Sequence, residues 1–307
     1  MDGVKRPETR ADLVQIKDPF NQTVRCYRVQ GTDIYFPPFP NLDERLKQFP
    51  DIHARNDDIL VCGYPKCGTH WIWEVVSMIV QGEASYSPAI KESVMMEAVS
   101  NASLDAQPSP RALNTHVSPD YIPSDFINRR CKIVYLLRNP KDMLVSMYNH
   151  TFNLLPFYGY EGTWAGYFEL FMEGRVDYGD WFRYVRDWEN LIDARPDLPI
   201  HVLYYEDMKK DPLAQIRKLA EFLGKGENLE LYRGIMDKCS FKNMKQAKAS
   251  CDDEVEKADW REGKPMMYRK GEVGDWKNWF TVSQNERLED KLKRELASSK
   301  LRFTYVL

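Results

Sequence analysis

Residues 58–76 read DILVCGYPKCGTHWIWEVV, and this stretch decides the fold of the chain. The apolar run at 59–62 predicts a strand that is buried on both faces. Gly63 then gives the backbone the freedom to turn, and Pro65 fixes its direction. Further on, apolar residues recur at helical spacing, which predicts a helix that begins near Thr69. The stretch therefore predicts a strand, a glycine-bounded loop and a helix in succession.

Such a loop is suited to bind an anion. The first N–H groups of a helix lack partners within the helix and lie at the positive end of its dipole. Lys66 adds a charge and Thr69 a hydroxyl. The pattern G-x-x-x-x-G-T is similar to the nucleotide P-loop, but Lys66 precedes the second glycine and so approaches the anion from a different side. The alternative is an ordinary strand-to-helix turn with an exposed lysine.

Composition limits what the rest of the chain can be. The 307 residues include 43% hydrophobic residues, enough for one large α/β domain or two small ones. The net charge is -3 and the pI about 6.0, so the chain has no basic excess that would point to nucleic acid. An anion site must therefore be built from a few local groups.

The sequence also carries expectations about location. Residues 1–18 are polar, without the apolar segment of a signal peptide, and no apolar run approaches the roughly 18 residues of a membrane span. The six cysteines show no CxxC spacing. We therefore expect a cytoplasmic protein without a membrane segment, with reduced thiols and neither a disulfide framework nor a metal site.

A second strand–helix unit follows at residues 132–148. Its apolar run predicts a buried strand, Arg138 comes where that strand ends, and Pro140 begins a helix that carries Ser146. Together Arg138 and Ser146 are able to hold a second phosphate, the arginine as a bidentate donor. The alternative is an arginine that is paired with Asp142.

Two more segments have the pattern of strands. Residues 200–205 precede a helix with Asp211 as its cap, and residues 111–119 begin apolar and end polar, as a strand does where it opens on a site. His116 lies at that end, either as a catalyst or as a hydrogen-bonded structural histidine. In the aromatic stretch at 152–193, Phe152 and Phe157 precede the predicted helices and are candidates for an apolar pocket wall.

These units predict an α/β fold, in which a central parallel sheet has helices on both faces and a P-loop-like strand-loop-helix binds the anion. We expect a single domain over residues 1–307. Residues 1–57 are predicted as a peripheral hairpin (strands at 24–29 and 34–36) and a short helix at 42–49. The charged, mostly irregular segment 239–281 is predicted to close over a ligand.

Two shorter segments follow the first strand–helix unit. Residues 88–97 are predicted to be helical, and residues 101–110 are predicted to form a loop.

Five motifs in this order resemble those of the cytosolic sulfotransferases, which use 3′-phosphoadenosine 5′-phosphosulfate (PAPS) and release 3′-phosphoadenosine 5′-phosphate (PAP). They are YPKCGTHW at 64–71, LRNPKD at 137–142 with Ser146, YEDM at 205–208, SFKNM at 240–244 and RKGEVGDWKN at 269–278. The motifs span about residues 60–290, nearly the whole chain.

The resemblance implies a role for each matching residue. The 63–71 loop would hold the 5′-phosphosulfate, Lys66 would reach the bridging oxygen, and His116 would be the catalytic base. The implied donor-binding residues are Lys66, Cys67, Gly68, Thr69, His70, Trp71, Arg138, Ser146, Tyr205, Cys239, Phe241, Arg269, Lys270 and Gly271. Trp71 and Phe241 would enclose the adenine. Asn114, His116, Phe152 and Phe157 are the predicted acceptor-binding residues.

Three residues depart from the family pattern. His70 replaces a threonine that contacts the donor phosphate, so that donor affinity could depend on pH. Asn114 replaces a lysine that helps to hold the sulfuryl group, and Cys239 replaces a threonine near the adenine. The sequence alone predicts that Asn114→Lys does not lower turnover.

Sulfuryl transfer resembles phosphoryl transfer in its loose transition state, so positioning and cations are expected to dominate catalysis. The alternatives are a P-loop-like nucleotide kinase and a catalytically silent PAP-binding protein. The acceptor would be a small hydrophobic or aromatic hydroxyl or amine compound, such as a phenol, catecholamine or sterol. Residues Lys277 to Glu286 resemble the family's dimerisation motif, which implies a homodimer.

Overall fold

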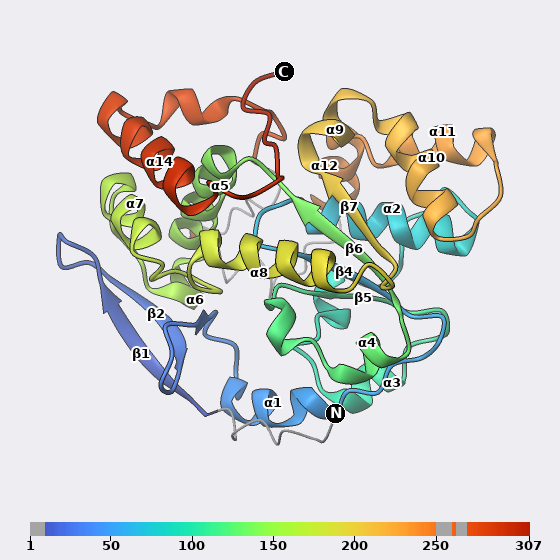
Figure 1. The fold of residues 1–307 in the computed structure, drawn as a ribbon, viewed down its shortest axis with the longest axis horizontal. Helices are drawn as coiled ribbons and strands as arrows, with labels where there is room; N and C mark the ends of the chain where they lie inside the picture. The colour runs from blue at the N-terminus through green and yellow to red at the C-terminus, as the bar shows by residue number, and fades with distance from the viewer. Residues whose placement is uncertain (1–9, 250–259, 262–268) are drawn as a thin grey trace.

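A four-stranded parallel sheet with strand order β5-β4-β6-β7 forms the centre of the fold (Figure 1). The computed structural model describes residues 10–249, 260–261 and 269–307. The strands are β4 (Ile59–Gly63), β5 (Ala112–Thr115), β6 (Lys132–Leu137) and β7 (Ile200–Tyr204). All three strand pairs are parallel. The predicted central parallel sheet is therefore confirmed.

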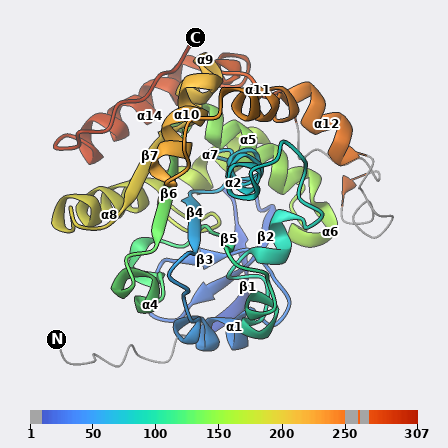
Figure 2. The same cartoon turned by 90° about the vertical axis from the view of Figure 1, so that its right-hand side faces the viewer.

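Helices cover both faces of this sheet. Helix α2 (Thr69–Gln81) follows β4 and begins at the predicted residue. The two ribbon views place α2 on one face and α8 (Trp181–Ala194) on the other (Figures 1 and 2). Strand β4 is buried at every position, because both of its faces are covered, and this explains its continuous apolar run.

The remaining helices surround this centre. They are α1 (Leu42–Gln48), α3 (Asn101–Asp105), α4 (Ser124–Asn128), α5 (Pro140–Asn153), α6 (Leu155–Tyr158), α7 (Trp164–Met172), α9 (Tyr205–Lys210), α10 (Pro212–Phe222), α11 (Leu229–Lys238), α12 (Phe241–Ala249) and α14 (Val282–Glu295). Asn139 caps α5 and Asp211 caps α10 through their side chains, as N-cap residues do. Within the described residues, no helix is long and apolar enough to cross a membrane.

A smaller antiparallel sheet lies at the N-terminal side. The predicted hairpin is present as β2 (Thr23–Val29) and β3 (Tyr35–Phe36), but β2 also pairs with β1 (Ala11–Lys17). Strand β1 is not predicted from the sequence, because it has only two buried residues, Ala11 and Ile16.

Three other local predictions need correction. Part of the segment 239–281 is helical, since α12 and a 3-10 helix, Asp275–Asn278, lie within it; its residues 250–259 and 262–268 lie outside the described residues. Helix α3 occupies a predicted loop. The helix expected near residues 88–97 is only a 3-10 turn, Lys91–Val94. Short helices have weak periodicity, so that packing decides whether they form.

Candidate active site

A cavity of about 690 Å³ lies beyond the carboxyl ends of the parallel strands. Open α/β sheets bind ligands at this edge. Most of the predicted site residues line it: Lys66, Gly68, Thr69, His70, Trp71, His116, Arg138, Ser146, Phe157, Tyr205, Cys239, Phe241, Arg269, Lys270 and Gly271. The fold thus brings together side chains from segments that are far apart in the chain.

The loop between β4 and α2 has an unusual backbone conformation. Lys66 and Gly68 both have positive φ, 68° and 99°. A Cβ at Gly68 would lie 2.9 Å from the ring of Tyr205, so only glycine fits there. Gly68 is also the N-cap of α2 and provides no side-chain cap, which leaves the N–H groups of the first turn for an anion.

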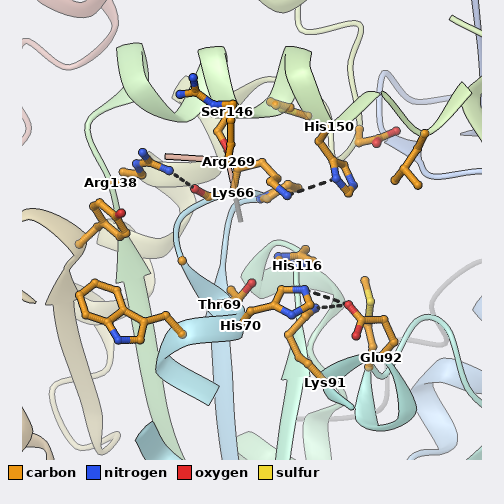
Figure 3. Close-up of a pocket in the computed structure, with 18 of the residues that line it drawn as sticks. Lys66, Thr69, His70, Lys91, Glu92, His116, Arg138, Ser146, His150 and Arg269 are labelled. Carbon is orange, nitrogen blue, oxygen red and sulfur yellow. Dashed lines mark hydrogen bonds and ion pairs between the residues drawn. The ribbon is translucent and has the colours of Figure 1, made fainter. Parts of the chain in front are cut away.

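Lys66 lies in the cavity wall, where its surroundings disfavour the charged form of its amine. Its Nζ lies 3.2 Å from Nδ1 of His150, and its carbonyl accepts a hydrogen bond of 2.9 Å from Nη1 of Arg138 (Figure 3). Burial, with a contribution from nearby Lys91, lowers the pKa of Lys66 to about 7. A bound anion would reverse this effect and restore the full charge.

Arg138 stands at the end of β6 and faces the same cavity. Its guanidinium lies over the ring of Tyr205 at 4.3 Å, and its Nε is buried without a hydrogen-bond partner among the described residues. Ser146 and His150 follow on α5, one turn apart, and both line the cavity. In the described structure Arg138 forms no ion pair with Asp142, whose carboxylate instead accepts hydrogen bonds from the backbone of Gly274 and Trp276 at 2.7 and 2.9 Å.

His116 is held as a neutral imidazole. Its Nδ1 lies 2.6 Å from the carbonyl oxygen of Gly63, which only accepts, so the proton is on Nδ1 and Nε2 keeps its lone pair. Burial and the charge of Lys91 hold the pKa of His116 well below its usual range. The backbone N–H of His116 donates to Glu97 Oε1 at 2.7 Å, and Tyr178 donates to the same oxygen at 2.9 Å.

The 3-10 turn Lys91–Val94 contributes charged side chains to the cavity. His70 Nε2 lies 2.9 Å from Glu92 Oε1, and Lys91 Nζ lies 3.7 Å from the same oxygen (Figure 3). Burial would raise the pKa of Glu92, but His70 and Lys91 outweigh it and hold that pKa well below its usual range. Burial lowers the pKa of His70.

The C-terminal part of the site is built around the carboxylate of Asp275. This carboxylate accepts hydrogen bonds from Arg269 and Lys270, each at 2.5 Å. The pKa of Asp275 lies well below its usual range, because these hydrogen bonds outweigh the effect of burial. Gly271 lies between the cations and the ring of Phe241. A Cβ at Gly271 would overlap that ring, so the glycine permits a close contact between α12 and this loop.

Three predicted residues do not line the cavity. Cys67 is buried behind the loop, and Phe152 instead packs under Arg261, whose guanidinium lies 4.1 Å from its ring. Asn114 is completely buried and is bonded to Lys91: its Oδ1 accepts from Lys91 Nζ at 3.1 Å, and its Nδ2 donates to the Lys91 carbonyl at 2.7 Å. Asn114 and Phe152 therefore do not line the cavity in the described structure, and their contact with the acceptor stays a prediction.

Several residues that line the cavity are not predicted from the sequence: Lys91, Glu92, His150, Asp177 and Tyr178. None belongs to a motif. For His150 a signal existed, since it follows Ser146 by four residues on a predicted helix. Asp177 lies in a loop that local patterns do not describe.

Comparison with known proteins places this geometry in a family. A sulfotransferase domain model matches residues 56–300. Human sulfotransferase 1C2 is 35% identical over 295 residues, which cover 91% of this chain and 95% of the relative. Dog sulfotransferase 1B1 is 36% identical over 304 residues, which cover 95% and 99%. The crystal structure of mouse sulfotransferase SULT7A1 complexed with PAP is similar with a TM-score of 0.75 and 31% identity, covering 90% of this chain and 96% of that one.

The chain belongs to the sulfotransferase family, as its five motifs predicted, and it is a PAPS-dependent sulfotransferase. The alternative of a nucleotide kinase is thereby set aside.

Proposed function

We propose that this enzyme transfers the sulfuryl group of PAPS to the hydroxyl of a small aromatic or hydrophobic acceptor, with His116 as general base. An amine in place of the hydroxyl fits the same chemistry. One observation carries the proposal: a single cavity has Lys66 and other cations at its donor end, and a neutral imidazole with a hydrogen-bonded Nδ1 faces the same space.

The residues present suit the donor. Two buried nitrogens, Trp71 Nε1 and Arg138 Nε, have no partner among the described residues and are available to a polar ligand. Arg138, Ser146, Arg269, Lys270 and Gly271 would hold the 3′-phosphate. The β4–α2 loop would hold the 5′-phosphosulfate, and Trp71 and Phe241 would enclose the adenine, with Tyr205 and Cys239 near it.

A cavity residue can be assigned to each step of the transfer. PAPS supplies a sulfuryl group on a phosphate leaving group. His116 Nε2 accepts the hydroxyl proton while the acceptor oxygen bonds to sulfur and the bond from sulfur to the bridging oxygen breaks. Lys66 stabilises the charge that develops on that oxygen, and the 5′-phosphate of PAP retains the bonding electrons.

The first test concerns the assignment of His116 as the general base. We expect His116→Ala to lower kcat with labelled PAPS and a phenol by at least about 100-fold, while PAP binding stays within several-fold. His53→Ala, at an exposed histidine, is the control and should change neither value. Comparable kcat for His116→Ala and the wild type would refute the assignment, and PAP binding without turnover on any acceptor would favour a silent PAP-binding protein.

We also propose a homodimer formed through Lys277 to Glu286. In the described structure this segment contains the start of α14, where Val282 is 76% exposed. An exposed valine beside a helix start suits an apolar contact between two copies. Cytoplasmic location remains a prediction.

A further inference from the structure

The acceptor end of the cavity contains a carboxyl group for which the transfer chemistry has no use. Asp177 lies between α7 and α8 and lines the cavity, with 8% of its surface exposed. Its loop is fixed at both sides: Tyr178 N–H donates to the Tyr35 carbonyl at 2.6 Å, and Tyr64 donates to the Gly179 carbonyl at 2.6 Å. The carboxyl group is therefore held in place.

Asp177 has no cationic partner among the described residues. The hydroxyl of Tyr158 donates a hydrogen bond to Oδ2 of Asp177 at 2.6 Å. The nearest cation along the chain, Arg175, pairs with Glu173 at 2.9 Å. The other cavity carboxylate, Glu92, is already paired with His70 and Lys91.

Burial without a cation raises the pKa of Asp177 to about 7. A buried carboxylate without a cationic partner destabilises the folded protein, and a cation on a bound ligand would remove this destabilisation. The local structure gives no other reason for an acid here, since Asp180 and not Asp177 caps α8 through its side chain.

The side chains around Asp177 have the composition of a cation site. Tyr158 packs edge-on against Phe157 at 4.9 Å, and Phe157 packs against Phe39 at 5.8 Å. All three line the cavity. Aromatic faces beside a carboxylate attract an ammonium group both through the ring quadrupole and through its charge.

This cation site is also close to the base. Tyr178, the neighbour of Asp177, packs edge-on against the ring of His116 at 5.4 Å. Asp177 and His116 thus line the same cavity, and Tyr178 connects the loop of Asp177 to the ring of His116.

We propose that the acceptors of this enzyme carry a protonated amine in addition to the hydroxyl, and that Asp177 is the residue that selects them. This inference rests on the proposed function and specifies its acceptor class: hydroxyaryl alkylamines.

Tyramine and 4-ethylphenol provide the test, because they differ only by the amino group. We expect the wild type to prefer tyramine by at least about tenfold in kcat/KM, in keeping with a charge-assisted hydrogen bond. In Asp177→Asn, which keeps the size of the side chain, the ratio of the two kcat/KM values should fall towards one. The control Asp187→Asn removes another partly buried carboxyl with a raised pKa, on α8 and outside the cavity, and should keep the wild-type ratio.

A measurement of tyramine binding distinguishes failure of this inference from failure of the proposed function. If neither phenol is sulfated, the proposed function fails, and calorimetric titration of tyramine into PAP-loaded protein still decides the role of Asp177. We expect at least tenfold weaker tyramine binding in Asp177→Asn than in Asp187→Asn. Equal tyramine affinity in both variants, or a wild type that treats both phenols alike, would overturn the inference.

Discussion

Lys66 is a half-buried cation whose protonation depends on the anion that binds in the cavity. With a pKa of about 7 in the free protein, Lys66 is protonated below pH 7 and largely neutral above it. The phosphosulfate would raise this pKa again, so donor binding above pH 7 must be accompanied by proton uptake. We infer that donor affinity falls as the pH rises through 7.

Calorimetry of PAP binding at pH 7.5, in two buffers with different ionisation enthalpies, measures this proton uptake. We expect the wild type to take up more protons than Lys66→Met, and its PAP affinity to fall by up to about tenfold per pH unit above 7. Lys132→Met is the control, because Lys132 also has a lowered pKa but lies outside the cavity. Identical proton uptake by the wild type and Lys66→Met would show that another group titrates.

Asn114 shows how a neighbour changes the meaning of a departure from the family pattern. The lysine that the family places here is absent, but Lys91 bonds to Asn114 and brings an ammonium group into the cavity from a different segment. The contacts therefore reverse the expectation that Asn114→Lys is harmless.

We now expect Asn114→Lys to lower the free energy of unfolding by about 2–5 kcal/mol and to reduce kcat, because two buried ammonium groups would meet. Thermal unfolding and PAPS turnover measure both effects. The double variant Lys91→Met/Asn114→Lys should recover most of the lost stability, with Lys91→Met alone as the reference. A single variant as stable as the wild type would contradict the proposed contact.

The contact between α12 and the 269–271 loop depends on a glycine. Gly271 has a φ of 68°, and a Cβ would overlap the ring of Phe241. The loop and the helix come from adjacent motifs, but only their packing shows that they share one surface.

Gly271→Ala should therefore weaken PAP binding by at least about tenfold, because the ring of Phe241 must move. Gly31→Ala is a matched control: its φ is 74°, with nothing within 4 Å of a Cβ. Both variants bear a similar backbone cost of about 1 kcal/mol, so that the difference in PAP affinity, measured by calorimetry, reports the clash. Equal PAP affinities of Gly271→Ala and Gly31→Ala would show that the position of Phe241 does not matter for donor binding.

Long, strongly patterned elements were predicted well, and short ones were not. The strand β4 is a continuous apolar run, the helix α2 has apolar residues at helical spacing, and both appear within a residue of expectation. Strand β1 and the turn Lys91–Val94 form through tertiary contacts: β1 pairs with β2, and Met96 N–H donates to the Asn114 carbonyl at 2.9 Å. Their sequences carry little signal because few of their residues are buried.

Assembly is a property of the whole molecule. If two copies meet at the start of α14, a charge at the exposed Val282 will separate them. We expect Val282→Glu to shift the molecular mass in sedimentation from dimer to monomer, with an unchanged Tm. Val306→Glu, at another exposed valine, should leave the mass as in the wild type. A monomeric wild type would refute the proposed dimer.

Local sequence is enough to predict the parallel sheet, the strand-loop-helix unit and the family, because these features depend on local periodicity and on motifs of residues close in the chain. Tertiary structure alone decided which other side chains join the cavity. Lys91 enters from a 3-10 turn, His150 from α5 and Asp177 from a loop between two helices. Their chemistry depends on burial and on neighbours from distant segments, which local patterns do not contain.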